Sequence, residues 1–144
     1  MKRVVFIIIS CLFLWSSICW GKMVSVGKNK VNVRSGPGTN YEVLWQVYKG
    51  YPVKILKKKG NWVKTEDYER DIGWIHQSLL SEIQTVIVIK DKVNIRKGPG
   101  TNYRVIFQAE KDVIFQLVDR KGDWLKVQHK DRVGWIRRDL VWGE

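Results

Sequence analysis

The sequence has 144 residues, of which 26 are Lys or Arg and 14 are Asp or Glu, for a formal net charge of +12. That length accommodates one or two small domains. The basic balance favours anionic partners, although charge can also serve solubility alone. Both cysteines, Cys11 and Cys19, lie near the N-terminus. A chain that loses them by processing has no disulfide, cysteine nucleophile or thiolate metal site.

The N-terminal residues have the layout of a secretory signal peptide. Met1 to Arg3 is positively charged, residues 4–15 are apolar apart from Ser10 and Cys11, and a short segment with small residues ends at Gly21. These are the three parts of such a signal. We predict that residues 1–21 direct export and are removed, with an uncleaved anchor or a lipoprotein-type signal as alternatives. The protein is then periplasmic or secreted, its membrane contact is transient, and nucleic acid is not an expected partner.

The rest of the chain carries one sequence twice. Three stretches of the first copy return in the same order in the second: 31–41 as 93–103, 60–62 as 122–124, and 73–75 as 134–136. The last pair shows that the second copy is one residue shorter. A repeat of this kind indicates two copies of one structural unit. We therefore predict two domains, at 22–83 and 84–144.

Each copy alternates apolar and polar residues with a period of two, which is typical of short β-strands. In chain order the first copy predicts a hairpin turn at 27–30, a longer loop at 35–41, turns at 49–50, 58–61 and 66–71, and one 3₁₀ turn at 76–80. The hairpin turn returns at 89–92. Five or six short strands in about 60 residues must curl into a small barrel. No Gly/Ser-rich linker separates the copies, so we expect the two barrels to keep a stiff relation.

On these motifs the chain resembles the bacterial SH3 domain (SH3b) family. The first copy has V-N-V-R-S-G-P-G-T-N-Y, then K-G, G-N-W-V-K and G-W-I-H-Q-S-L-L, and the second has V-N-I-R-K-G-P-G-T-N-Y, G-D-W-L-K-V and V-G-W-I-R-R-D-L. The resemblance covers nearly all of the chain after the leader, twice and in order. It implies an all-β fold of two tandem SH3-like barrels. It also implies an exported or envelope protein that binds cell wall or peptides, often as the targeting part of a wall hydrolase.

The candidate ligand groove lies between the Gly-Pro-Gly loop and the hairpin with the second repeated tryptophan. A tyrosine there offers a ring face and a hydroxyl, and a tryptophan after a glycine stands where a ligand can come close. Simple packing is the alternative for both. The candidate ligand-binding residues are Asn40, Tyr41 and Trp74 in the first copy and Asn102, Tyr103 and Trp135 in the second.

Other repeated residues have more ordinary interpretations. We expect Trp62 and Trp124 to fill the barrels, and Arg34 and Arg96 to bind loop carbonyl groups rather than a ligand. The basic runs at 57–59 and 120–121 fit a solvated turn, with an electrostatic contact to an anionic polymer as the alternative.

Signals for catalysis are poor. The two histidines, His76 and His129, occupy different positions in the two copies, and no HExxH, GxSxG or P-loop motif occurs. Two histidines are too few for an ordinary zinc site. We expect a non-catalytic protein without cofactor or metal that binds a cell-envelope ligand, a peptidoglycan peptide or glycan. The alternative is a periplasmic adaptor that binds a peptide segment or a partner enzyme.

Overall fold

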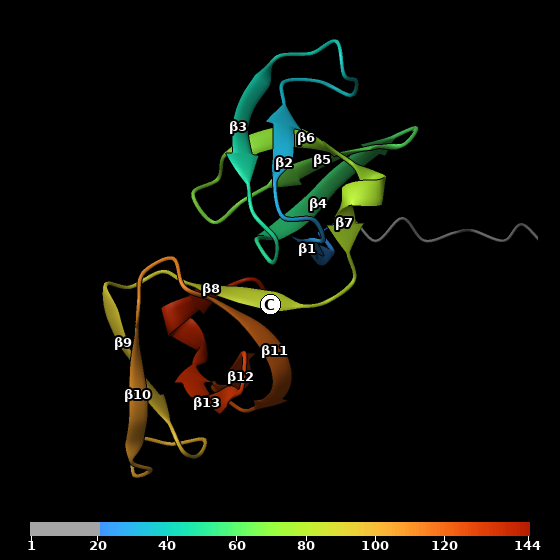
Figure 1. Cartoon of the computed structure of the whole chain (residues 1–144). Coiled ribbons are helices and arrows are strands. Elements are labelled where there is room, and N and C mark those ends of the chain that lie inside the picture. Colours follow the sequence, from blue (N-terminus) through green and yellow to red (C-terminus); the bar gives the residue numbers. More distant parts are fainter. Residues whose placement is uncertain (1–20) are drawn as a thin grey trace, which may run out of the picture.

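The computed structural model describes residues 21–144 and consists of two seven-stranded antiparallel sheets, one following the other along the chain (Figure 1). The all-β prediction and the tandem arrangement are confirmed. Apart from Gly21, the predicted signal peptide lies outside the described residues. Within residues 21–144, no helix is long and apolar enough to cross a membrane.

The first module has the strand order β3-β2-β6-β5-β4-β1-β7. Its strands are β1 (Met23–Val26), β2 (Val31–Arg34), β3 (Val43–Val47), β4 (Pro52–Lys59), β5 (Trp62–Glu66), β6 (Ile72–His76) and β7 (Leu80–Ser81). A 3₁₀ turn, η1 (Gln77–Leu79), joins β6 to β7, as the sequence predicts.

The second module repeats this order as β10-β9-β13-β12-β11-β8-β14. Its strands are β8 (Thr85–Val88), β9 (Lys92–Arg96), β10 (Val105–Glu110), β11 (Ile114–Lys121), β12 (Trp124–His129), β13 (Arg132–Arg137) and β14 (Val141–Trp142), with η2 (Arg138–Leu140) before the last. Each module therefore has one or two strands more than predicted. The additional β7 and β14 have two residues each, too few for an alternation to be visible.

The predicted hairpins at 27–30 and 89–92 are wrong. β1 pairs with β4 and β7, whereas β2 pairs with β3 and β6. Residues 27–30 thus carry the chain around a corner of the barrel. The backbone there bonds to other segments, since Gly27 N donates to Leu79 O at 2.8 Å and Ile89 N donates to Leu140 O at 3.0 Å. Alternation locates strands, but it does not show which strands pair.

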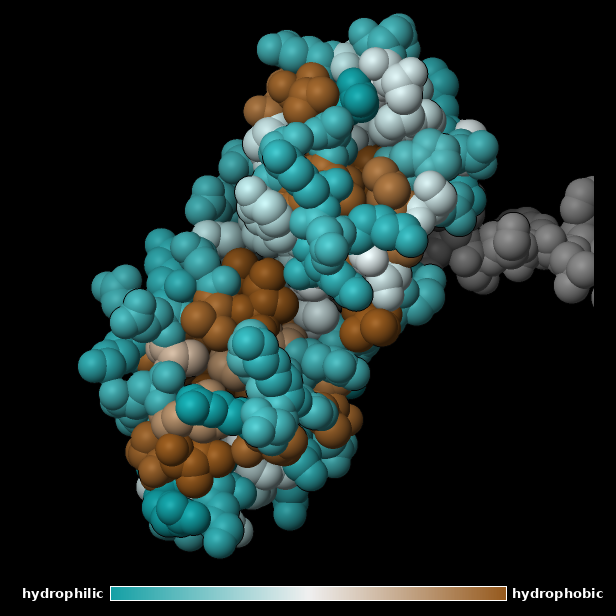
Figure 2. Space-filling model, in the orientation of Figure 1, coloured by the Kyte–Doolittle hydropathy of each residue, from teal (hydrophilic) through white to brown (hydrophobic). Residues whose placement is uncertain are grey.

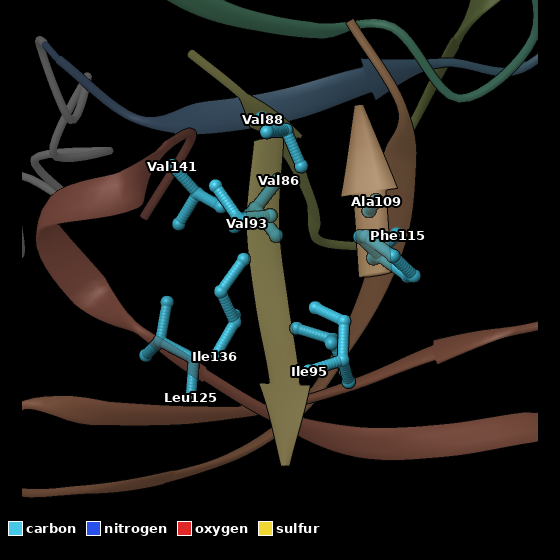
Figure 3. Close-up of a cluster of buried hydrophobic side chains, with 10 residues drawn as sticks. Val86, Val88, Val93, Ile95, Ala109, Phe115, Leu125, Ile136 and Val141 are labelled. Carbon is cyan, nitrogen blue, oxygen red and sulfur yellow. The ribbon is translucent and has the colours of Figure 1, made fainter. Parts of the chain in front are cut away.

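Inward-facing side chains fill each module, as expected for a small barrel. The second core contains Val86, Val88, Val93, Ile95, Ala109, Phe115, Leu125, Val127, Ile136 and Val141, most of them labelled in Figure 3. The first core is built from Val26, Val31, Val33, Val47 and Ile75. In β2, β5 and β6, and in β9, β12 and β13, one residue in two is buried, so the alternate residues form an outer face. In β1 and β8, consecutive residues are buried.

Direct contacts join the two modules. The link is short, because β7 ends at Ser81 and β8 begins at Thr85. Thr85 Oγ1 donates to the Gly50 carbonyl at 2.6 Å, and the Tyr68 hydroxyl donates to Asp112 at 2.6 Å. These contacts give a physical basis for the predicted stiff relation between the barrels.

Candidate functional site

The second repeated tryptophan of each module lies on the outer face of the sheet. Along β6, Gly73 and Ile75 are buried, while Trp74 between them is half-buried. Its register partners are Arg34 on β2 and Lys64 on β5. Directly opposed residues on neighbouring strands have Cβ atoms about 4.5–5.5 Å apart. Trp74 is therefore flanked by two cations.

The second module repeats this row. Trp135 on β13 is half-buried between the buried Gly134 and Ile136. It lies opposite Arg96 on β9 and Lys126 on β12. An Arg–Trp–Lys row across three strands thus occurs once in each module.

The glycine before each tryptophan serves the core, not the ligand. A Cβ on Gly73 would lie 2.3 Å from Val33 Cγ1, and one on Gly134 would lie 2.4 Å from Ile95 Cγ2. Both glycines face inward, so the space that they leave is already filled by barrel side chains. The glycines do allow a close approach, as inferred from sequence, but core side chains make that approach and not a ligand.

The Gly-Pro-Gly loop is tied to the sheet by the arginine of the same row. Arg34 donates to the carbonyl oxygens of Thr39 and Tyr41, both at 3.0 Å. Arg96 makes the equivalent bonds to Thr101 at 3.1 Å and Tyr103 at 2.9 Å. The prediction that these arginines bind loop carbonyl groups is confirmed. The backbone of each predicted tyrosine is thereby connected to the row that contains the predicted tryptophan.

The tyrosine rings cover the loop and remain partly open to solvent. A Cβ on Gly36 would come within 2.3 Å of the Tyr41 ring, and one on Gly98 within 2.4 Å of the Tyr103 ring. Each tyrosine is still 43% exposed. Next to each tyrosine, Asn40 and Asn102 are exposed and turn toward the second glycine of the loop. One ring face therefore packs on glycine while part of the ring stays available.

Trp62 and Trp124 do not fill the barrels, contrary to the prediction. Each is half-buried and precedes a fully inward residue, Val63 or Leu125. Trp62 packs edge-on against the His76 ring, with centroids 5.2 Å apart. The period-two pattern predicts the observed orientation, because neighbouring residues of a strand point to opposite faces. The apolar valine or leucine after each tryptophan points inward, so the tryptophan points outward.

The outer face of the second module contains a hollow of about 210 Å³. Trp124 and its register partner Arg137 line it, together with Asn94, Arg96 and Thr101 among others. Neither Tyr103 nor Trp135 belongs to this lining. The position of Arg137 is held by His76 in the first module, so the two outer faces differ in charge. The sequence patterns did not point to Lys64, Lys126 or Arg137, and they placed Trp124 in the core and not on this face.

The basic runs lie on strands. Lys57, Lys58 and Lys59 belong to β4, and Arg120 and Lys121 belong to β11, so each turn begins only at the following glycine. The strand ends extend beyond the barrel core, which leaves Lys58 and Lys59 exposed.

The one buried carboxylate of the described residues has a structural role. Asp67 accepts hydrogen bonds from the backbone N–H groups of Glu69 and Asp71, at 2.9 and 3.0 Å, and from the Tyr51 hydroxyl at 3.4 Å. Burial raises the pKa of Asp67 above its ordinary value, although the backbone bonds oppose this. The carboxylate fixes the loop between β5 and β6. Residues 21–144 contain no group of three His, Cys, Asp or Glu side chains placed to hold a metal.

The family model described as "Bacterial SH3 domain" matches residues 27–82 and 89–143, and so covers both modules. The chain belongs to the bacterial SH3 domain family. This membership agrees with the resemblance found in the sequence motifs, and it accounts for the repeated strand order.

Two curated relatives match the chain over part of their length. It is 27% identical over 161 residues to the putative N-acetylmuramoyl-L-alanine amidase YrvJ of Bacillus subtilis (strain 168), which covers 98% of this chain and 31% of that protein. It is 38% identical over 52 residues to the probable cell wall amidase LytH of Staphylococcus epidermidis, which covers 35% of this chain and 18% of that protein. The chain therefore spans less than a third of the length of these relatives.

Solved structures show a more distant likeness. NlpC2 from Trichomonas vaginalis aligns with 86% of this chain and 48% of that one, at 18% identity and a TM-score of 0.39. An NlpC/P60 family protein from Bacillus cereus ATCC 10987 aligns with 84% of this chain and 56% of that one, at 13% identity and a TM-score of 0.39.

Proposed function

We propose that this SH3b protein is exported and binds peptidoglycan without catalysing a reaction on it. The observation that carries the proposal is the repeated outer face, on which an Arg–Trp–Lys row adjoins a Tyr-containing loop in both modules. Two curated relatives bear names of wall amidases, and this chain matches only a part of each. That pattern supports a wall-binding part, in the periplasm or outside the cell.

The ring faces and amides of the proposed site come from the residues named from sequence. Trp74 and Trp135 would offer ring faces to sugar or to the apolar part of a peptide. The exposed part of Tyr41 and Tyr103 would add contact and a hydroxyl donor. Asn40 and Asn102, exposed beside these rings, would add amide hydrogen bonds.

The lysines and arginines of the Arg–Trp–Lys rows have different roles in the proposal. Lys64 and Lys126 stand opposite the tryptophans, where they would attract the free carboxylates of the wall polymer. Arg34 and Arg96 act indirectly, because their guanidinium groups already hold the loop. Mutating the arginine should therefore loosen the loop, whereas mutating the lysine should change mainly the dependence of binding on salt.

Two copies on one chain raise affinity for a repeating polymer. Once the first module is bound, the second searches only a small volume and binds at a high effective concentration. Loss of one module's site should then weaken binding strongly without abolishing it, and loss of both should remove it.

Co-sedimentation with purified sacculi tests the proposal. We expect the protein to enter the pellet at low salt, Trp74→Ala and Trp135→Ala each to lower the bound fraction, and the double variant to remain in the supernatant. Tyr48→Ala is the control, because Tyr48 is 63% exposed and lies outside the row. A wild-type protein that stays in the supernatant contradicts the proposal, and so does a double variant that binds normally.

A further inference from the structure

A cleft of about 520 Å³ lies between the two modules, away from the outer faces described above. Its walls come from both copies, with Lys28, Lys49 and Leu80 from the first module and Ile114, Gln116 and Lys130 from the second. Pockets for small ligands have volumes of about 300–1,000 Å³ and often lie at domain interfaces. Figure 2 shows hydrophobic residues near the junction of the modules and also in other places on the face that is seen.

The charged side chains that line the cleft are positive. Lys28, Lys49 and Lys130 lie on three different turns around it and are all exposed, and no acidic residue belongs to its lining. None of the ion pairs found among residues 21–144 involves these three lysines. Cations grouped around a concave surface attract an anionic ligand, because the field adds within the hollow.

The uncharged part of the lining indicates which anion fits. Gln116 and Gln128 bring side-chain amides, which donate and accept hydrogen bonds as a peptide backbone requires. Ile83, 54% exposed, adds apolar surface with Leu80 and Ile114. A phosphate polymer could use the cations and the amide N–H groups, but it would leave the apolar surface uncovered. Amides, apolar surface and cations together suit a short acidic peptide.

Parts of the cleft are fixed by specific contacts. Ser25 Oγ donates to the Ile83 carbonyl at 2.6 Å, and Thr85 Oγ1 donates to the Gly50 carbonyl at 2.6 Å. Lys130 has a φ of +53°, and its carbonyl accepts a bond from Gln128 Nε2 at 2.9 Å. This is the turn in which the second copy is one residue shorter. The corresponding turn of the first copy is the acidic loop around Asp67, which does not line the cleft.

We propose that the inter-module cleft binds the acidic peptide portion of peptidoglycan. The inference rests on the proposed function and adds to it a site that neither module has alone. Each outer face would bind one repeat unit of the polymer, while the cleft would bind a carboxylate of its peptide portion. Peptides whose carboxyl groups are amidated should bind less well, because they lack the charge that the lysines attract.

Charge reversal in the intact protein tests this proposal. Lys49→Glu combined with Lys130→Glu should weaken binding of a soluble peptidoglycan peptide with free carboxylates by about tenfold, since each change replaces attraction with repulsion at short range. Lys59→Glu combined with Lys121→Glu is the matched control. It makes the same change in net charge at exposed, equivalent positions of the two modules. We expect it to change peptide affinity by less than about twofold.

The possible results separate the two proposals. Equal losses in both double variants would show a general charge effect and would overturn the cleft assignment. It would also be overturned by wild-type protein that binds the amidated peptide equally well, or that prefers a phosphate-bearing wall polymer. Wild-type protein that fails to sediment with sacculi refutes the proposed function itself. If sacculi bind but the peptide does not, only the cleft proposal fails. Melting temperatures of both variants, expected to match the wild type, confirm folding.

Discussion

One methyl group at Gly73 tests the packing of the first barrel. A Cβ there would lie 2.3 Å from Val33 Cγ1 and 3.3 Å from the Arg34 carbonyl oxygen, whereas carbon atoms in contact prefer roughly 3.5–4.0 Å. Val33 is 2% exposed and belongs to the first core. Overpacking of this kind costs about 1–3 kcal/mol. We therefore expect Gly73→Ala to lower the free energy of unfolding by about 2 kcal/mol, measured by urea titration.

Gly36→Ala is the matched control in the same module. Its new methyl would also lie 2.3 Å from another residue, but that residue is the Tyr41 ring, which is 43% exposed and can turn into solvent. We expect this variant to cost less than about 1 kcal/mol. If both variants lost the same free energy of unfolding, the distinction between the rigid core at Gly73 and the movable tyrosine at Gly36 would be refuted. Gly134→Ala should reproduce the larger loss in the second module, where the Cβ would meet Ile95.

Three further predictions concern the loop, the junction and pH. Arg34→Met removes two hydrogen bonds to the loop, so loop amides should exchange hydrogen faster; unchanged exchange would contradict this role. Tyr68→Phe removes the 2.6 Å bond to Asp112 and should cost about 1 kcal/mol, while Tyr48→Phe should be neutral; equal melting temperatures would show that the bond contributes nothing. Burial raises the pKa of Asp67, so the folded state binds this proton more tightly than the unfolded state, and the stability contribution falls as pH rises between the two pKa values. Asp67→Asn should remove this fall in urea titrations at pH values above the ordinary pKa of an aspartate, about 3.9, and an unchanged slope would refute it.

Sequence reasoning identified the repeat, the family and most strands, because these depend on local signals. The motif around Gly36 and the alternation of Val31 and Val33 are both visible within a few residues. Strand pairing is different: β1 pairs with β4 and β7 across the barrel, and no local pattern records that choice. The short strands β7 and β14 exist only because they complete pairing with β1 and β8.

The candidate site was only partly predictable for the same reason. The arginine contact to the loop followed from chemistry and proximity in sequence. The inward or outward direction of Trp62 followed from its neighbour Val63, but bulk and apolar character suggested the interior. The hollow with Trp124 and Arg137 requires side chains from two neighbouring strands, and the inter-module cleft requires both copies. Surfaces assembled from distant segments appear only when the fold is known.

The most direct test of the central proposal is an NMR titration that follows the tryptophan indole N–H signals as soluble peptidoglycan fragments are added. The account predicts saturable shifts for Trp74 and Trp135, the repeated outer-face tryptophans, and little change for Trp142 on β14. Assignments would come from Trp→Phe variants. Signals of Trp74 and Trp135 that stay unchanged while fragments bind would place the site elsewhere. No shift in any indole signal at saturating fragment would contradict the proposal that these outer faces bind the wall.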